Sequence, residues 1–294
     1  MKLKTRNEIE IEKPIILPPS PKIETFPFIN ERHRLLLEEF YTMLIKEAKE
    51  EYLSSFYQNI TSLIIEEKRG FINTLITLFT AGSYDFYNNK ISIYPFQERY
   101  CDIIKHELLH MATRKKDKDK CHVGFLQVQK ELYIGNTLNE GYTEIMCKRI
   151  QDNYQISPSY KYPLIIAQII ETIVGKEKMK ELYFTGDLYE LTNILTKYNT
   201  RSNVKDFLID TDYILSPLYR KELSNKVIDI NNFIYETFTN WLIKESIDKP
   251  LLEEYKSFIE LITQVLEIYN KDIINKNIKY NTEAGKTKIK ILSK

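Results

Sequence analysis

The stretch from His106 to His110 reads His-Glu-Leu-Leu-His, and the apolar spacing of residues 98–111 around it predicts a helix. Four residues turn a helix by about 400°, so the two histidines share one face and can reach one metal ion. Glu107 is rotated from that face by about 100°, which places its carboxylate beside the ion, where it can accept a proton from water. A helix with two hydrogen-bonded histidines and no metal is the plainer alternative.

A second acidic segment follows, where residues 138–144 read Leu-Asn-Glu-Gly-Tyr-Thr-Glu. Two histidines leave zinc one short of the three protein ligands of a catalytic site. Here the chain resembles the gluzincin metallopeptidases, in which the glutamate of an Asn-Glu pair on a second helix completes H-E-x-x-H. The resemblance implies that Glu140 is the third zinc ligand, paired with Asn139, and that Glu144 is the carboxylate behind a ligand histidine. The alternative for Glu140 is a glutamate favoured by the dipole at a helix N-terminus.

A hairpin is predicted before the helix that contains His106 and His110. Residues 84–87 and 91–94 alternate in polarity on either side of Asn88-Asn89. In the family that the chain resembles, a strand at this place forms the edge of a small sheet and pairs with an extended peptide substrate. The resemblance therefore assigns substrate binding to an edge strand that contains Ile91, Ser92 and Ile93.

The resemblance covers residues 82–150, about a quarter of the chain. Twenty-nine residues separate His110 from Glu140, more than in thermolysin-like enzymes, which points to smaller or divergent gluzincins such as the lethal-factor-like group. Tyr133 lies seven residues before Glu140, at a place like that of the active-site tyrosine in lethal-factor-like enzymes. The resemblance thus implies that Tyr133 stabilises the oxyanion of peptide hydrolysis.

The other histidines are not assigned to the site. Residues 114–120 form a charged run that predicts a solvated loop, and His122 beside it is expected to be exposed. Contact of His122 with substrate or metal is a minor alternative. His33 is interpreted as a surface or helix-capping residue.

The pattern predicts an α+β, mostly helical fold with a zincin-like core and a helical C-terminal subdomain. We expect a Pro-rich extended arm at 1–28, a catalytic core at 29–154, a helical subdomain at 155–280 and a basic tail at 281–294. The arm is expected to be loose, and an arm that lies in the cleft is the alternative. Helical spacing is also seen at 36–48, 71–80, 164–174, 175–184, 187–198, 226–241 and 251–269.

Composition narrows the class of protein. Lys and Arg number 42 and Asp and Glu 41, a near balance that gives no reason to expect nucleic acid or an anionic membrane as partner. Residues 163–174 are the most apolar window and are too short to span a bilayer. Without a signal-peptide pattern, a soluble cytoplasmic protein is expected, and leaderless export stays open. The sequence carries no signal for an oligomeric state.

These features together predict a zinc metallopeptidase that cleaves a peptide or protein substrate, with Glu107 activating water at a Zn²⁺ ion. No motif that anchors a free amino terminus is visible, which favours an endopeptidase. The alternative is a binding or toxin-like module whose zinc is structural or occluded; Cys121 and His122 are the nearby candidates for a fourth ligand. Cys101 and Cys147 are expected to be core residues.

Overall fold

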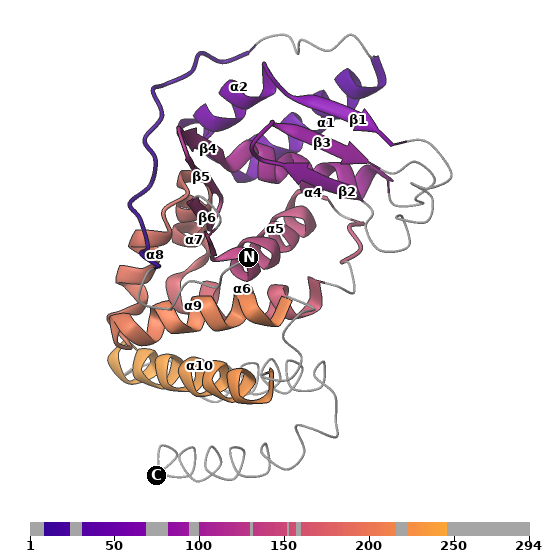
Figure 1. Cartoon of the computed structure of the whole chain (residues 1–294). Helices are drawn as coiled ribbons and strands as arrows, with labels where there is room; N and C mark the ends of the chain where they lie inside the picture. Colours follow the sequence, from indigo (N-terminus) through magenta and orange to yellow (C-terminus); the bar gives the residue numbers. More distant parts are fainter. Residues whose placement is uncertain are drawn as a thin grey trace. The chain divides into compact units, whose positions relative to one another are not determined.

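The computed structural model describes residues 9–23, 31–68, 82–93, 100–129, 132–151, 153–156, 160–215 and 223–245 (Figure 1). The chain divides into two compact units, Met1–Leu195 and Thr196–Lys294. The described part is mixed and mostly helical with small sheets, which confirms the predicted α+β class. The predicted helices at 71–80 and 251–269 and the tail at 281–294 lie outside the described residues.

The first unit consists of helices around two small sheets. This unit extends to Leu195, past the boundary expected at 154. The helix after that boundary, Lys161–Val174, packs along the helix before it, Asn136–Ile150. The helices are α1 (Glu31–Glu47), α2 (Ser54–Ile60), α4 (Tyr100–Thr113), α5 (Asn136–Ile150), α6 (Lys161–Val174), α7 (Lys176–Thr185) and α8 (Leu188–Leu195), with one 3-10 turn, η2 (Glu50–Tyr52).

The first sheet has the order β1-β3-β2 and contains the predicted hairpin. Its strands are β1 (Ile64–Glu67), β2 (Gly82–Asp85) and β3 (Lys90–Ile93). Strand β3 pairs antiparallel with β2 and parallel with β1. The prediction that residues 91–93 form a free edge is therefore wrong. Strand β1 pairs with the side of β3 that a hairpin alone would leave unpaired. The sequence of β1 has no alternating polarity from which this strand could be predicted. Among the described strands, β2 is the edge of this sheet that packs against the helix of His106 and His110.

The second sheet is a meander in the order β4-β5-β6-β7. Its strands are β4 (Arg114–Asp117), β5 (Lys120–Val123), β6 (Leu126–Gln129) and β7 (Leu132–Ile134). The prediction of a loop at 114–120 is wrong, because Arg114–Asp117 form β4 and pair with β5, which begins at Lys120. The charged run is nevertheless solvated at 116–119, whose residues are exposed. Its cations reach backbone carbonyls: Arg114 Nε donates to Phe86 and Lys115 Nζ to Thr185.

The described part of the arm is held against the first unit (Figure 1, indigo). The Glu12 backbone N–H donates to Gln127 Oε1 at 2.9 Å, and Gln127 Nε2 donates back to the Glu12 carbonyl at 2.8 Å. Further along, Gln58 Nε2 donates to the Pro18 carbonyl at 3.0 Å. The expectation of a loose arm is wrong for residues 9–23, because side chains of β6 and α2 form hydrogen bonds with its backbone at Glu12, Pro18 and Ser20.

The second unit contains a helix pair, α9 (Arg201–Leu215) and α10 (Leu223–Glu245). The rings of Phe207 and Phe233 stack with centroids 4.3 Å apart, and Lys226 pairs with Asp210. Helix α10 contains the predicted segment 226–241. Among the described helices of the chain, none combines the length and apolar character that a membrane span requires.

Candidate metal centre

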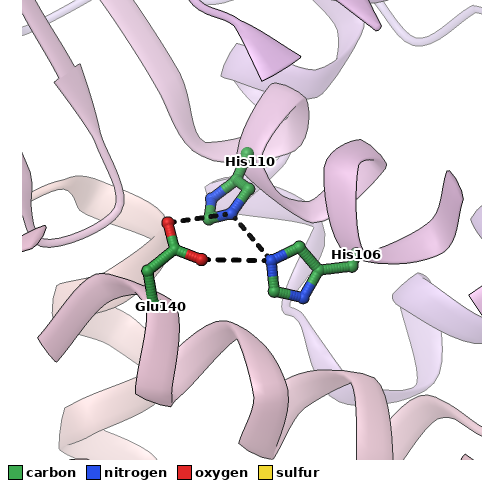
Figure 2. A group of neighbouring side chains, drawn as sticks. All are labelled: His106, His110 and Glu140. Atoms are coloured by element: carbon green, nitrogen blue, oxygen red, sulfur yellow. Dashed lines mark hydrogen bonds and ion pairs between the residues drawn. The ribbon is translucent and has the colours of Figure 1, made fainter. Parts of the chain in front are cut away.

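Helix α4 carries the two histidines of the motif. The helix packs against α2, β2, β3 and α5. Leu108 and Leu109, between the histidines, are fully buried and anchor it in the core. His106 and His110 are also nearly buried, and they face α5 (Figure 2).

Helix α5 brings Glu140 to the histidines. Gly135, in the left-handed region with φ of 83°, separates β7 from the helix. No acidic residue lies in the first helical turn, so the helix-dipole interpretation of Glu140 does not apply. At the next position, a Cβ atom on Gly141 would stand 1.9 Å from the Pro163 carbonyl oxygen of α6, so only glycine permits this approach of the two helices.

Three ligand groups converge at one point, as Figure 2 shows. The Nε2 atoms of His106 and His110 are 3.1 Å apart. Glu140 Oε2 lies 3.3 Å from His106 Nε2, and Glu140 Oε1 lies 3.5 Å from His110 Nε2. Burial acts to raise the pKa of Glu140, but the facing His110 and His106 outweigh it and hold that pKa far below its usual range. The arrangement places two nitrogen donors and one carboxylate around a common centre.

Each histidine is supported at its other ring nitrogen. His106 Nδ1 lies 3.0 Å from Glu144 Oε1, and Glu144 also accepts a hydrogen bond from the Tyr154 hydroxyl at 2.7 Å. His110 Nδ1 lies 3.3 Å from Asn139 Nδ2, an amide nitrogen that can only donate, so a hydrogen bond forms here when Nδ1 is the unprotonated ring nitrogen. A carboxylate that faces the second ring nitrogen, as Glu144 faces His106, is the kind of neighbour that orients a metal-ligating histidine. Asn139 and Glu144, both singled out from the sequence, therefore each lie beside one histidine of the ligand group.

Glu107 lies beside the ligand group and outside it. Its side chain is buried, and burial raises its pKa above the usual range against the opposing effects of His106 and His110. A Cβ atom built on Gly82 would stand 3.5 Å from Glu107 Oε1 and 2.6 Å from Ile103 Cγ2. The glycine thus allows β2 to pass close to the metal helix, next to this carboxylate.

Tyr133 does not join the ligand group in its recorded contacts. It lies on β7, is 45% exposed, and its ring meets Phe86 with centroids 6.4 Å apart. Another tyrosine lies at the ligands: the ring of Tyr160 stacks on the imidazole of His106, with centroids 5.1 Å apart and planes inclined by 8°. Sequence reasoning missed Tyr160 because it is the residue that caps α6, and no spacing rule relates that position to the histidines.

Two predictions about the remaining histidines are wrong. His122 is 1% exposed because β5 is covered by the arm, and burial lowers its pKa to about 4. Its Nε2 lies 3.9 Å from Glu12 Oε2, which is beyond hydrogen-bond distance. His33 is also buried, and burial lowers its pKa. Neither residue belongs to the ligand group.

The two imidazoles and the carboxylate suit a metal ion of intermediate softness. In the described ranges, the group of histidine, cysteine or acidic side chains that could hold an ion is His106, His110 and Glu140, with ligand atoms within 4.8 Å of one another. Two imidazoles and a carboxylate suit zinc, although other divalent ions also accept such donors. Cys121 and His122, the candidates for a fourth ligand, are elsewhere on β5. Cys147 is buried, as predicted, and the side chain of Cys101 lies outside the described features.

The grouping of His106, His110 and Glu140 was thus predictable from the sequence, whereas the stacking of Tyr160 on His106 and the central position of β3 were not. We compared the chain with protein-family models, curated proteins and solved structures. None of the three comparisons gave a match.

Proposed function

We propose that this protein is a peptide-bond hydrolase of gluzincin type, with Zn²⁺ as its metal and a peptide or protein as its substrate. The observation that carries the proposal is the convergence of His106 Nε2, His110 Nε2 and the Glu140 carboxylate at 3.1–3.5 Å. A buried glutamate that belongs to none of these contacts stands next to them on the same helix. Three ligands and one free base are the composition of a hydrolytic zinc site rather than of a structural one.

His106, His110 and Glu140 would hold the metal. When bound, a metal of this kind acts as a Lewis acid on a carbonyl and lowers the pKa of water. The chain's own contribution is to orient the ligands: Glu144, beside His106 Nδ1, can accept the proton that a metal-bound imidazole carries on that nitrogen.

Glu107 would move the proton. Its burial favours the neutral form, so a proton accepted by its carboxylate can be held and then delivered to the leaving amine. The shared position of Glu107 and the histidines on α4 keeps the base beside the reacting atoms.

Strand β2 is the better candidate for the substrate-binding edge. Among the described residues it pairs on one side only, with β3, and Gly82 at its start lies beside Glu107. An extended peptide could add to the free side of β2 through backbone hydrogen bonds. This replaces residues 91–93 by a strand for which the described residues provide a partner on one side only.

The test combines metal analysis with digestion of a peptide library. Glu107→Gln should retain one Zn²⁺ per chain and lose hydrolysis by more than about 10³-fold. Glu38→Gln, an exposed change of the same kind on α1, serves as the control and should behave as wild type. Undiminished activity of Glu107→Gln would refute the assigned mechanism.

The alternative is a binding or toxin-like module with a structural or occluded metal. X-ray absorption at the zinc edge separates the two readings by counting the protein ligands. Three protein ligands together with hydrolysis support the enzyme. Four protein ligands, with no product from wild type, would establish the structural site instead.

A further inference from the structure

The side chains of the arm at residues 9–23 are covered and exposed with a period of three. Every third residue from Ile11 to Ile23 is partly covered by the first unit, and every third residue from Glu10 to Lys22 is exposed. A β-strand would alternate with a period of two, whereas a polyproline II helix has three residues per turn. The arm therefore has the exposure pattern of a polyproline II helix that lies on the first unit by one of its three rows of side chains.

The sequence and the contacts of the arm explain this conformation. Most of residues 13–21 are prolines or directly precede one, and both kinds of residue are restricted to extended backbone. Gln127, Gln58 and Ser54 then hold the backbone of the arm through hydrogen bonds. A partner that binds this segment would find it already ordered, which removes the entropy cost of ordering an extended ligand.

The two outer rows of the arm are exposed together from residue 16 to residue 22. Their members there form what we call the proline strip: Ile16, Pro18, Pro19, Pro21 and Lys22. Ile16 is 90% exposed, compared with 53% for Leu35 and Ile64. Pro18 and Pro21 belong to the same row and stand one helical turn apart, about 9 Å. The proline strip is thus an apolar ridge that the described part of the chain leaves exposed.

The charge around the proline strip has one sign. From Lys13 to Ile23 the sequence contains two lysines and no acidic residue. Lys13 Nζ lies 6.0 Å from the centroid of the Tyr189 ring, and Lys22 Nζ lies 3.3 Å from Glu50 Oε1. Both lysines are exposed, and a surface ion pair contributes so little that Lys22 can exchange Glu50 for a carboxylate of a partner. The proline strip therefore fits a surface that is apolar along its groove and acidic at its rim.

We infer that the proline strip is a docking ligand for another protein, namely a small domain of the SH3 kind with an aromatic-lined groove and an acidic rim. Grooves of this kind bind proline-rich segments in the polyproline II conformation. The inner row can stay on the first unit while the two outer rows enter the groove, so neither contact excludes the other. The interaction is separate from the metal centre, because the arm supplies none of the three ligands.

The test titrates the full chain into a panel of ¹⁵N-labelled SH3 domains and follows the resonances of the groove by NMR. Pro18→Ala and Pro21→Ala change the outer rows. Pro14→Ala changes the inner row and is the matched control. Lys22→Glu reverses the charge at one end of the strip. Hydrogen exchange in residues 9–23 verifies that each variant keeps the arm on the first unit.

Wild type should bind at least one domain of the panel and shift the resonances of its groove. Pro18→Ala and Pro21→Ala should each weaken this binding about 10-fold, because each withdraws an apolar side chain from the groove. Lys22→Glu should weaken it by a similar factor that becomes smaller at high salt. Pro14→Ala should bind as wild type does.

Several results would overturn the inference. If no domain of the panel shows a shift, the strip is not a ligand of this class. Equal affinities of wild type and Pro18→Ala, or a loss in Pro14→Ala alone, would place the contact outside the strip. In ultracentrifugation, a wild-type dimer that Pro18→Ala dissociates would make the strip an interface between two copies of this chain. Binding to phosphatidylserine vesicles that Lys22→Glu abolishes would make it a membrane contact.

Discussion

Two regions of the first unit bury a histidine, and they do so with opposite electrostatic results. At the α4–α5 centre, burial alone would lower the pKa of His106, but its contacts with Cys147, Glu140 and Glu144 outweigh burial and raise that pKa well above its ordinary value. Under the arm, His122 is buried as deeply and its pKa falls to about 4. Burial therefore does not by itself decide the direction of the pKa shift of a histidine; the facing carboxylates reverse it at His106.

The largest expected effect removes a ligand from the first region. Glu140→Ala takes away the carboxylate that both histidines face, so Zn²⁺ affinity should fall by more than about 100-fold. Competition with a coloured chelator measures this affinity. His122→Leu should leave it unchanged. A wild-type affinity in Glu140→Ala would show that the ligand assignment is wrong.

A smaller effect is expected from the support behind a ligand. Glu144→Gln keeps an oxygen near His106 Nδ1 but removes its charge, and Zn²⁺ affinity should fall about 10-fold. The same competition measures the effect, with Glu38→Gln as the control for loss of a carboxylate. An affinity equal to that of wild type would mean that Glu144 does not act on the metal through His106.

In the second region, burial of His122 should change how the free energy of unfolding depends on pH. The pKa of His122 is about 4 in the folded chain and near 6.5 when unperturbed, so as pH falls the unfolded chain binds the proton first. The contribution of neutral, buried His122 to the free energy of unfolding is complete above pH 6.5 and is lost as the pH falls from 6.5 to 4. In metal-free protein, lowering the pH from 7.5 to 5 should therefore cost wild type about 2 kcal/mol more than His122→Leu.

Denaturant unfolding at both pH values measures this difference. Because each variant is compared with itself, the loss of packing in His122→Leu cancels from the result. If the free energy of unfolding fell by the same amount in both proteins between pH 7.5 and 5, His122 would have its ordinary pKa in the folded chain. The contrast between the two buried histidines would then disappear.

The smallest effect concerns the cover over His122. Gln127→Ala removes both hydrogen bonds to the Glu12 backbone, and the arm should lose about 1–2 kcal/mol of local stability. Hydrogen exchange in residues 9–23 should become faster, while exchange in α4 and α5 stays as in wild type. Gln168→Ala on α6 is the control. Unchanged exchange in the arm would show that other contacts hold it.

The difference between the regions also explains what could be predicted from the sequence. His106 and His110 could be paired from the sequence because helical spacing puts them on one face, and that interval is local. Glu140, which lies 30 residues further along the chain, was assigned through the resemblance and not through any spacing. The hairpin at Asn88-Asn89 is local as well, and it is confirmed.

Features set by distant contacts could not be predicted in this way. The central position of β3 depends on β1, which joins the sheet from outside the hairpin. The burial of His122 depends on the arm, which is more than a hundred residues away in the sequence. The stacking of Tyr160 on His106 depends on how α6 packs on α5. In each case the deciding partner has no fixed sequence interval to the residue it affects.

The contact between Gly141 and Pro163 has a consequence for protein engineering. Since the backbones of α5 and α6 touch at the residue next to Glu140, the depth at which that carboxylate stands is set by a helix that supplies no ligand. A graft of the two motif helices onto another scaffold would lose this spacing. The smallest portable unit is therefore the trio α4, α5 and α6, transferred with its glycine and its proline.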